Sequence, residues 1–325
     1  MLKVDPSPYL LAEAIIVDVG GLALPFSQIP NIIISESVGL SIVFFLVNIF
    51  PLVILSIIFS VWFLFRELRE SVGLVDQRRK LLILEANEWI FVRDIKIFKR
   101  SAVIFGLVIL AFMVIPQIHL VALAGAIAFL IFGGVKPEEI FSHIDWNTLI
   151  FFTGLYIMVG AMEYKGILHD VGVFLGKTTM GNIYLATILI LWIVAVLSGA
   201  VDNVAIAIAF IPIVKSMAEA SGLGPLIDIL WISMILGTNL GGNILPYGAP
   251  TTILAMGVSK KHGYSFSIRD FFKLGSVWGI SNLALASAYI LSRLYATILL
   301  QRLGLNLIHV LVFLTVGLGL ISLIT

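Results

Sequence analysis

Seven long stretches of this chain contain no Asp, Glu, Lys or Arg, and this pattern limits the possible folds more than any other feature. The stretches are 37–65, 101–135, 146–162, 178–201, 229–259, 274–291 and 303–325. Only 12% of the residues are charged and the mean hydropathy is +1.11, whereas soluble domains carry about a quarter charged residues. A helix needs about 20 apolar residues to cross a bilayer. We therefore predict an all-α polytopic membrane protein, and we exclude water-soluble enzymes and nucleic-acid binders.

The stretches predict how the chain is threaded. Pro116 lies near the middle of 101–135, so we expect two spans, at about 101–116 and 118–134, and then a third at 146–163. The segment 182–215 carries a polar tip at 198–203. Polar, non-helical backbone is tolerated at membrane depth only where protein or a watery cavity surrounds it. We therefore expect a re-entrant hairpin at 182–215, whose two arms return to the same side of the membrane.

Charge sets the expected orientation. The connector 66–100 holds nine of the 20 Lys and Arg residues, and the positive-inside rule predicts that it is cytoplasmic. Its second half, 81–100, either lies along the membrane surface as an amphipathic segment or is a plain solvated linker helix. We expect a multi-pass protein of the plasma membrane, with an extra C-terminal span at 303–325.

The span at about 226–258 is predicted to be broken, because glycines, prolines, asparagines and threonines crowd the stretch 237–251. Pro and Gly interrupt a helix, and unwound backbone at a bilayer's midplane is how secondary transporters build a binding site. The alternative is a kink whose small residues serve helix packing. The candidate substrate- or ion-binding residues at the hairpin tip and in the break are Ser198, Asp202, Asn203, Asn239, Gly241, Gly242, Asn243, Gly248 and Thr251.

A weaker copy of the broken helix opens the chain, with Asp18, Pro30 and Asn31 among its polar and helix-breaking residues. We add Asp18 and Asn31 to the candidate binding residues. The two copies are expected to run in opposite directions, which indicates an inverted repeat. The first repeat would occupy 1–65, as a broken helix plus one span. The second would occupy 101–297, with three spans, the hairpin, the broken helix and a span at 271–292, so the first is expected to be truncated.

Ionisable residues at membrane depth are candidates for coupling to an ion. Asp202 is suited both to coupling and to capping the second hairpin arm. Glu13 and Asp18 either relay a proton or cation or are buried by an inter-helix hydrogen bond. At the start of the span 146–163, either Asp145 or Asn147 is expected to serve as a helix cap. No metal site is expected, because the five histidines are scattered and the chain has no cysteine.

Four motifs, taken in order, resemble a known transporter group. They are DPSPYLLAEA at 5–14, DWNTLIFFTGL at 145–155, VDNV at 201–204 and LGGNILPYGAP at 240–250. They resemble the arsenite permease, sodium–proton antiporter D and P-protein group of the ion transporter superfamily, with its citrate-transporter-like domain. The resemblance implies a scaffold of long spans and a mobile transport domain with two hairpins and two broken helices. Members move arsenite, dicarboxylates or citrate, or exchange sodium for protons.

The chain departs from that group at its N-terminal half. The group's first hairpin has no counterpart, and its usual NIGGTATLIGDPPN reads DVGGLALPFSQIPN at 18–31, so two threonines become Leu22 and Leu24 and a glycine becomes Ser27. This half-site has lost hydroxyl groups. The chain would then be a divergent, shortened relative, one half of a split transporter, or a reading frame whose start was assigned too late.

The expected function is secondary active transport of a small inorganic or organic anion or oxyanion, similar to arsenite or a dicarboxylate, by alternating access. The alternatives are a sodium–proton antiporter and a transport-incompetent membrane subunit that needs a partner chain. No nucleophile–base pair indicates an enzyme. No cofactor is expected beyond a sodium ion or proton as coupling ion. The expected partners are the bilayer and a small ion, with either a homodimer or a chain that supplies the missing half of the first repeat, and no nucleic acid.

Overall fold

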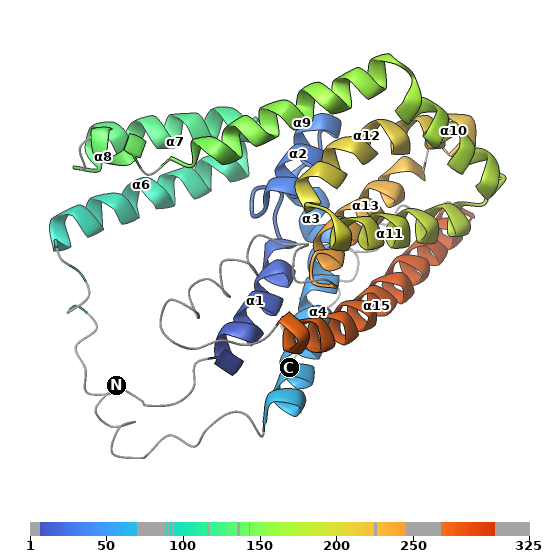
Figure 1. Ribbon diagram of the computed structural model, residues 1–325, viewed down its shortest axis with the longest axis horizontal. Helices are drawn as coiled ribbons and strands as arrows, with labels where there is room; N and C mark the ends of the chain where they lie inside the picture. The colour runs from blue at the N-terminus through green and yellow to red at the C-terminus, as the bar shows by residue number, and fades with distance from the viewer. Residues whose placement is uncertain are drawn as a thin grey trace, which may run out of the picture.

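The computed structural model describes residues 7–69, 89, 92, 94–115, 117–134, 137–142, 144–223, 226–244 and 268–302. Apart from single turns, the regular elements of this described part are all helices, as predicted (Figure 1). They are α1 Ser7–Gly21, α2 Ile29–Val38, α3 Ile42–Asn48, α4 Phe50–Leu68, α6 Ile95–Val114, α7 Ile118–Phe132, α8 Pro137–Ser142, α9 Trp146–Tyr164, α10 Ile167–Thr179, α11 Ile183–Ala200, α12 Asn203–Ala220, α13 Ile227–Gly241 and α15 Ile268–Arg302.

Within the described residues, five helices are long and apolar enough to cross a membrane, which confirms a polytopic membrane protein. They are α4, α6, α11, α12 and the stretch Phe271–Leu299 of α15. The bent pair of α2 and α3, which meet at 113°, would make a sixth. The predicted break between two helices is present, since α6 ends at Val114 and α7 begins at Ile118. Helix α7 is a shorter apolar helix of 15 residues, so the second span at 118–134 stays a prediction. The predicted span 303–325, and residues 70–88 of the linker, lie outside the described residues.

The expected single span after the first broken helix is interrupted, because α3 ends at Asn48 and α4 begins at Phe50. Pro51 lies in the first turn of α4 and has no N–H to donate to the carbonyl of Val47, four residues earlier. The side chain of Arg293, on α15, fills this gap. It donates to the Val47 carbonyl at 3.2 Å and to Oδ1 of Asn48. A side chain from the C-terminal part of the chain thus holds the kink in the N-terminal part.

Helices α10 to α13 pack closely because glycines face their neighbours' backbones. A Cβ added to Gly172 or Gly176, on α10, would lie within 3 Å of a carbonyl oxygen of α12. A Cβ added to Gly237 or Gly241, on α13, would meet carbonyl oxygens of α11 at 2.7 Å and 2.3 Å. Small residues allow this approach where helices pack inside a membrane.

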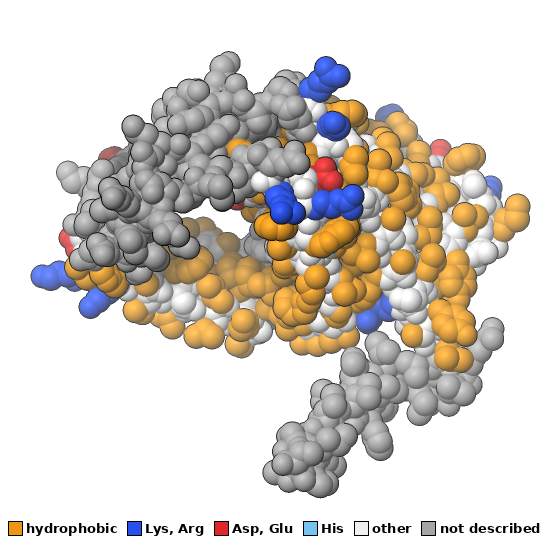
Figure 2. All heavy atoms as spheres, turned by 90° about the horizontal axis from the view of Figure 1, so that it is seen from below, with side chains coloured by type: hydrophobic (Ala, Val, Ile, Leu, Met, Phe, Trp, Pro, Cys, Tyr) orange, Lys and Arg blue, Asp and Glu red, His pale blue; other side chains and the backbone are white. Residues whose placement is uncertain are grey.

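The α6–α7 pair stands apart from this packed unit (Figure 1). No side chain of α6 is buried. The pair meets the first broken helix near its turn, where the rings of Phe26 and Phe112 stack at 4.5 Å and Glu36 lies 3.2 Å from Nδ1 of His119. Hydrophobic side chains cover most of the described surface in Figure 2, as helices that contact lipid require.

Candidate functional site

The first predicted break is present between α1 and α2. Helix α1 ends at Gly21, and α2 begins at Ile29 with Pro30 in its first turn. The amide of Asn31 donates to the carbonyls of Gly21 and Leu24 at 2.9 Å and 3.1 Å. These bonds satisfy carbonyls that the interrupted helix leaves without partners. Asn31 therefore shapes the loop that joins the two half-helices.

The second predicted break begins where α13 ends, at Gly241. A turn follows, in which the N–H of Ile244 donates to the Gly241 carbonyl at 3.0 Å. Among the described residues, regular helix therefore ends at Gly241. The second half of the predicted broken helix, with Gly248 and Thr251, lies outside the described residues.

Two asparagines connect this break to the first one: Asn239 lies on α13, and Asn243 lies just beyond its C-terminal end. The amide of Asn239 donates to Oδ1 of Asn31 at 2.9 Å, and the amide of Asn243 donates to the carbonyl of Ile15 at 3.4 Å. All three asparagines are fully buried. Their side chains hold the two broken helices together, and none of them lines the pocket described below.

Ser198 and Gly241 also serve packing. The hydroxyl of buried Ser198 donates to the carbonyl of Thr238 at 2.6 Å, which ties the end of α11 to α13. A Cβ at Gly241 would lie 2.3 Å from the carbonyl oxygen of Ala195. Gly242 follows directly as the C-cap of α13. Ser198 and Gly241 thus make packing contacts, and a role of these residues and Gly242 in binding stays a prediction.

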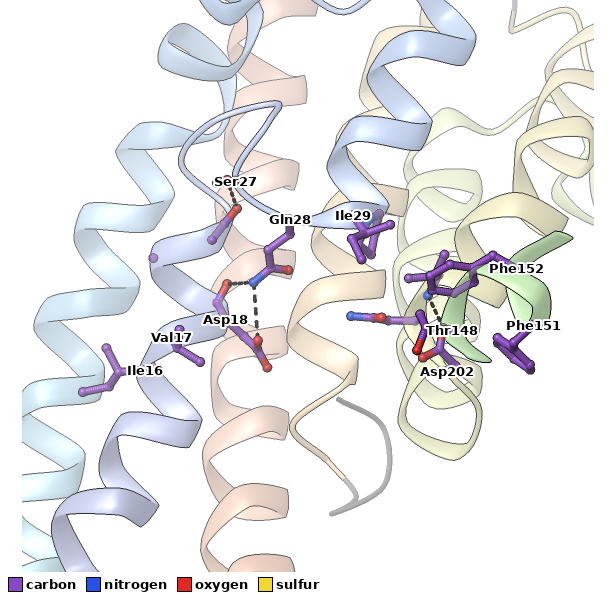
Figure 3. Close-up of a pocket in the computed structure, with 15 residues that line it drawn as sticks. Ile16, Val17, Asp18, Ser27, Gln28, Ile29, Thr148, Phe151, Phe152 and Asp202 are labelled. Atoms are coloured by element: carbon purple, nitrogen blue, oxygen red, sulfur yellow. Dashed lines mark hydrogen bonds between the residues drawn. The ribbon is translucent and has the colours of Figure 1, made fainter. Parts of the chain in front are cut away.

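A pocket of about 770 Å³ lies between the α1–α2 break, the hairpin tip and the start of α9. Figure 3 shows Asp18 and Gln28 on one side of it, and Asp202, Thr148 and the rings of α9 on the other. The residues that line it are Ile16, Val17, Asp18, Gly20, Gly21, Ser27, Gln28, Ile29, Pro30, Thr148, Phe151, Phe152, Asp202, Asn203 and Val204. The fold thus brings the first break and the hairpin tip together, although Asp18 and Asp202 are 184 positions apart in the chain.

Asp202 caps a helix, as expected, while its coupling role stays a prediction. It is the N-cap of α12, because its Oδ1 accepts hydrogen bonds from the N–H groups of Val204 and Ala205 at 2.9 Å and 3.3 Å. Its side chain also lines the pocket, next to that of buried Asn203. The positive end of the α12 dipole therefore lies at the pocket wall.

Asp18 is 3% exposed in the last turn of α1. Gln28 donates its amide to Oδ1 and to the backbone carbonyl of Asp18, both at 3.3 Å. The predicted burial by a hydrogen bond is thus present, with a donor from the loop that precedes α2. Glu13 is exposed and does not line the pocket, so its coupling role stays a prediction without support from this geometry.

Sequence reasoning missed Gln28, Thr148, Phe151 and Phe152. The three residues of α9 lie within the DWNTLIFFTGL motif, where only the cap was recognised. That cap is present, since Asp145 accepts hydrogen bonds from the hydroxyl and the N–H of Thr148 at 2.6 Å and 3.1 Å. These bonds hold the pKa of Asp145 below its ordinary value. The cap fixes the first turn of α9, from which Thr148 faces the pocket.

The described pocket lining carries two carboxyl groups and no Lys, Arg or His. Amide groups of Asn203 and Gln28 and hydroxyl groups of Ser27 and Thr148 complete its polar surface. An anion alone would be repelled by two carboxylates and would find no opposite charge on this wall. The arrangement suits a cation, or an anion that arrives together with cations.

A family model for citrate transporters matches residues 1–237. The chain belongs to the citrate transporter family. An uncharacterized transporter of Mycobacterium tuberculosis (strain ATCC 25618 / H37Rv) is 30% identical over 298 residues, which are 90% of this chain and 69% of that protein. The 46 kDa membrane protein of Mycobacterium leprae is 29% identical over 89% of this chain and 68% of its own length. The human P protein is 29% identical over 58% of this chain and 24% of its own length.

Membership of this family indicates that the protein is a membrane transport protein and not an enzyme. The resemblance to the P-protein group is confirmed, as is the citrate-transporter-like domain. The likeness to arsenite permeases and to antiporter D, and the truncation of the first repeat, stay predictions.

Proposed function

We propose that this transporter is a secondary active carrier, which moves a small anion or oxyanion together with cations by alternating access. The observation that carries the proposal is the pocket with Asp18 and Asp202 on opposite sides and no cationic side chain among its described lining residues. A citrate-like or arsenite-like solute would be bound by the neutral donors, and accompanying protons or sodium ions would balance the charge.

The position of the pocket supports alternating access. The pocket is lined by the first broken helix, by the hairpin tip and by the start of α9. The resemblance stated above implies that hairpins and broken helices belong to a mobile domain, whereas spans such as α9 belong to the scaffold. A solute held between the two sets would pass from one side of the membrane to the other as they slide.

The polar groups of the pocket suit oxygen-rich solutes. Asn203, which follows Asp202 in the chain, brings a neutral amide donor to the pocket. The oxygen of Thr148 can accept a hydrogen bond from a solute, since its own proton is donated to Asp145, and Gln28 lies across the pocket from Thr148 and Asp202. Hydrogen bonds from neutral donors orient carboxylate or hydroxyl oxygens without adding fixed positive charge. The rings of Phe151 and Phe152 supply apolar surface, as is usual for small-molecule pockets.

A sodium–proton exchanger is the second candidate. It is favoured by the same two carboxyl groups, because a cation needs no anionic companion in this pocket. The two functions differ in one measurement. An exchanger moves protons when only a sodium gradient is applied, whereas a carrier of anions needs an anion before protons or sodium ions move.

The test uses the full chain, purified and reconstituted in proteoliposomes. Radiolabelled citrate and arsenite are offered in turn under an inward proton or sodium gradient, and a sodium gradient alone is applied with a pH indicator inside. We expect Asp202→Asn, which removes a charge, and Asn203→Ala, which removes a hydrogen-bond donor to a charged solute, each to reduce uptake by about tenfold or more. A hydrogen bond that involves a charged group contributes about 1.5–3 kcal/mol, and about 1.4 kcal/mol corresponds to a factor of ten.

The matched control is Glu163→Gln, which removes a carboxylate from the exposed far end of α9. We expect it to transport as the wild type does. Uptake that survives both pocket variants would show that this pocket is not the transport site. Proton movement driven by sodium without any anion would replace the anion carrier with the exchanger.

A further inference from the structure

A second pocket lies at the end of the α6–α7 pair where α6 begins and α7 ends. It has a volume of about 640 Å³ and shares no lining residue with the pocket that contains Asp18 and Asp202. Helix α6 contributes Lys99, Arg100, Val103 and Ile104, and the end of α7 contributes Ile131, Phe132 and the following Gly134. The pocket therefore combines two cationic side chains with apolar walls.

The antiparallel packing of α6 and α7 fixes the order of these groups along the pocket. A Cβ added to Gly125 would lie 2.7 Å from Cγ2 of Val108, and one added to Gly134 would lie 3.6 Å from Cγ1 of Ile97. Positions 97 and 108 of α6 thus face positions 134 and 125. The two cationic residues, Lys99 and Arg100, lie toward the open end of the pair, and Val103 and Ile104 lie one turn further in.

The cations of this end are not neutralised by described carboxylates. Lys96, Lys99 and Arg100 are three and four positions apart, so they share one face of α6, and all three are exposed. Among the described residues, ion pairs form only at His119 and at His169. The nearby carboxylate of Asp94 instead caps α6, because it accepts hydrogen bonds from the backbone N–H groups of Lys96 and Ile97.

The surroundings of the pocket are those of a membrane surface. Helix α6 is long and apolar enough to cross a membrane, and none of its side chains is buried. Just before it, the exposed ring of Trp89 packs edge-on against Phe98 at 5.9 Å, and tryptophan is enriched where lipid meets water. The positive-inside rule predicts that this end of α6 faces the cytoplasm, where the leaflet carries anionic lipids.

We propose that this pocket binds the head group of an anionic phospholipid. Lys99 and Arg100 bind the phosphate oxygens, and the planar guanidinium of Arg100 can hold two of them at once. The acyl chains lie against the apolar walls further in. A soluble anion would use the same cations but would gain nothing from those walls, so the order of charge and apolar surface favours a lipid. The proposal does not depend on the proposed transport function.

The test is native mass spectrometry of the full chain in detergent, titrated with phosphatidylglycerol or with phosphatidylcholine of the same acyl chains. We expect the wild type to retain phosphatidylglycerol at concentrations at which phosphatidylcholine is not retained. The double variant Lys99→Gln, Arg100→Gln should bind phosphatidylglycerol about 30-fold more weakly, since each cation near a membrane surface contributes about fivefold. Its thermal midpoint without added lipid should equal that of the wild type, because both side chains are exposed.

The matched control is Lys165→Gln, Lys177→Gln, which removes the same charge from exposed positions at the two ends of α10, far from the start of α6 (Figure 1). It should bind both lipids as the wild type does. Equal retention of the two lipids by the wild type would overturn the proposal. Unchanged retention in the Lys99, Arg100 variant, or an equal loss in the control, would also overturn it.

Two further measurements distinguish a lipid from a soluble anion. Val103→Trp keeps both cations but fills the pocket beside them, so it should also weaken the binding of phosphatidylglycerol. Inorganic phosphate and citrate, added in large excess, should not displace the lipid from the wild type. Displacement by either anion, together with normal lipid binding by Val103→Trp, would show a site for soluble anions and would refute the lipid assignment.

Discussion

Replacement of Gly241 by alanine separates the two interpretations of the glycines in α13. The added Cβ would lie 2.3 Å from the carbonyl oxygen of Ala195 and 2.5 Å from its Cα. An ordinary carbon–oxygen contact is about 3.3 Å or longer, so α11 and α13 must move apart by about 1 Å. The nearest atoms belong to the backbone, so no side-chain rotation relieves the clash.

Overpacking of this kind costs about 1–3 kcal/mol, and the better helix propensity of alanine offsets up to about 1 kcal/mol. We expect the midpoint of thermal unfolding in detergent, followed by tryptophan fluorescence, to fall by about 2–8 °C. Gly160→Ala is the control, because a Cβ at Gly160, within α9, meets nothing within 4 Å. It should leave the midpoint unchanged or raise it slightly. Equal midpoints for the two variants would refute the packing interpretation of Gly241.

Three further predictions concern hydrogen bonds between distant parts of the chain. Asn239→Leu leaves Oδ1 of Asn31 without its 2.9 Å donor and should lower the unfolding free energy by about 1–3 kcal/mol. In a double-mutant cycle with Asn31→Leu, followed by thermal unfolding, stability losses that simply add would contradict the contact. Trp278→Phe removes the 2.9 Å bond from Nε1 to Ser60 and also leaves a cavity, because Trp278 is fully buried. Its loss of unfolding free energy should be about 1 kcal/mol smaller when Ser60→Ala is already present, and equal losses in the two backgrounds would contradict the bond. Arg293→Lys should destabilise the detergent-solubilised protein by about 1–2 kcal/mol, because a lysine cannot reproduce a guanidinium that donates to two acceptors at the end of α3; an unchanged midpoint would show that the kink does not depend on it.

The pocket lining divides the predicted site residues into two groups. The sequence pattern placed Ser198, Asn239 and Asn243 in the binding site because polar residues at membrane depth are costly. In the structure, hydrogen bonds to other helices offset the free-energy cost of burying these polar side chains. Asp202 and Asp18 have partners too, but their side chains also line the pocket. Residue type alone could not separate these groups, since both satisfy the same physical requirement.

The sequence by itself determined the elements. Charge-free stretches set the helices, since a bilayer leaves backbone groups no other partner. Proline, glycine and Asp202 set where helices stop and start, because these effects act within one turn. Only the tertiary structure decided which residues meet. Three placements depend on how separate helices pack: Gln28 contacts Asp18, Thr148 lies across the pocket from them, and Arg293 binds at the kink after α3. That packing is fixed by contacts between side chains far apart in the chain, which no local pattern contains.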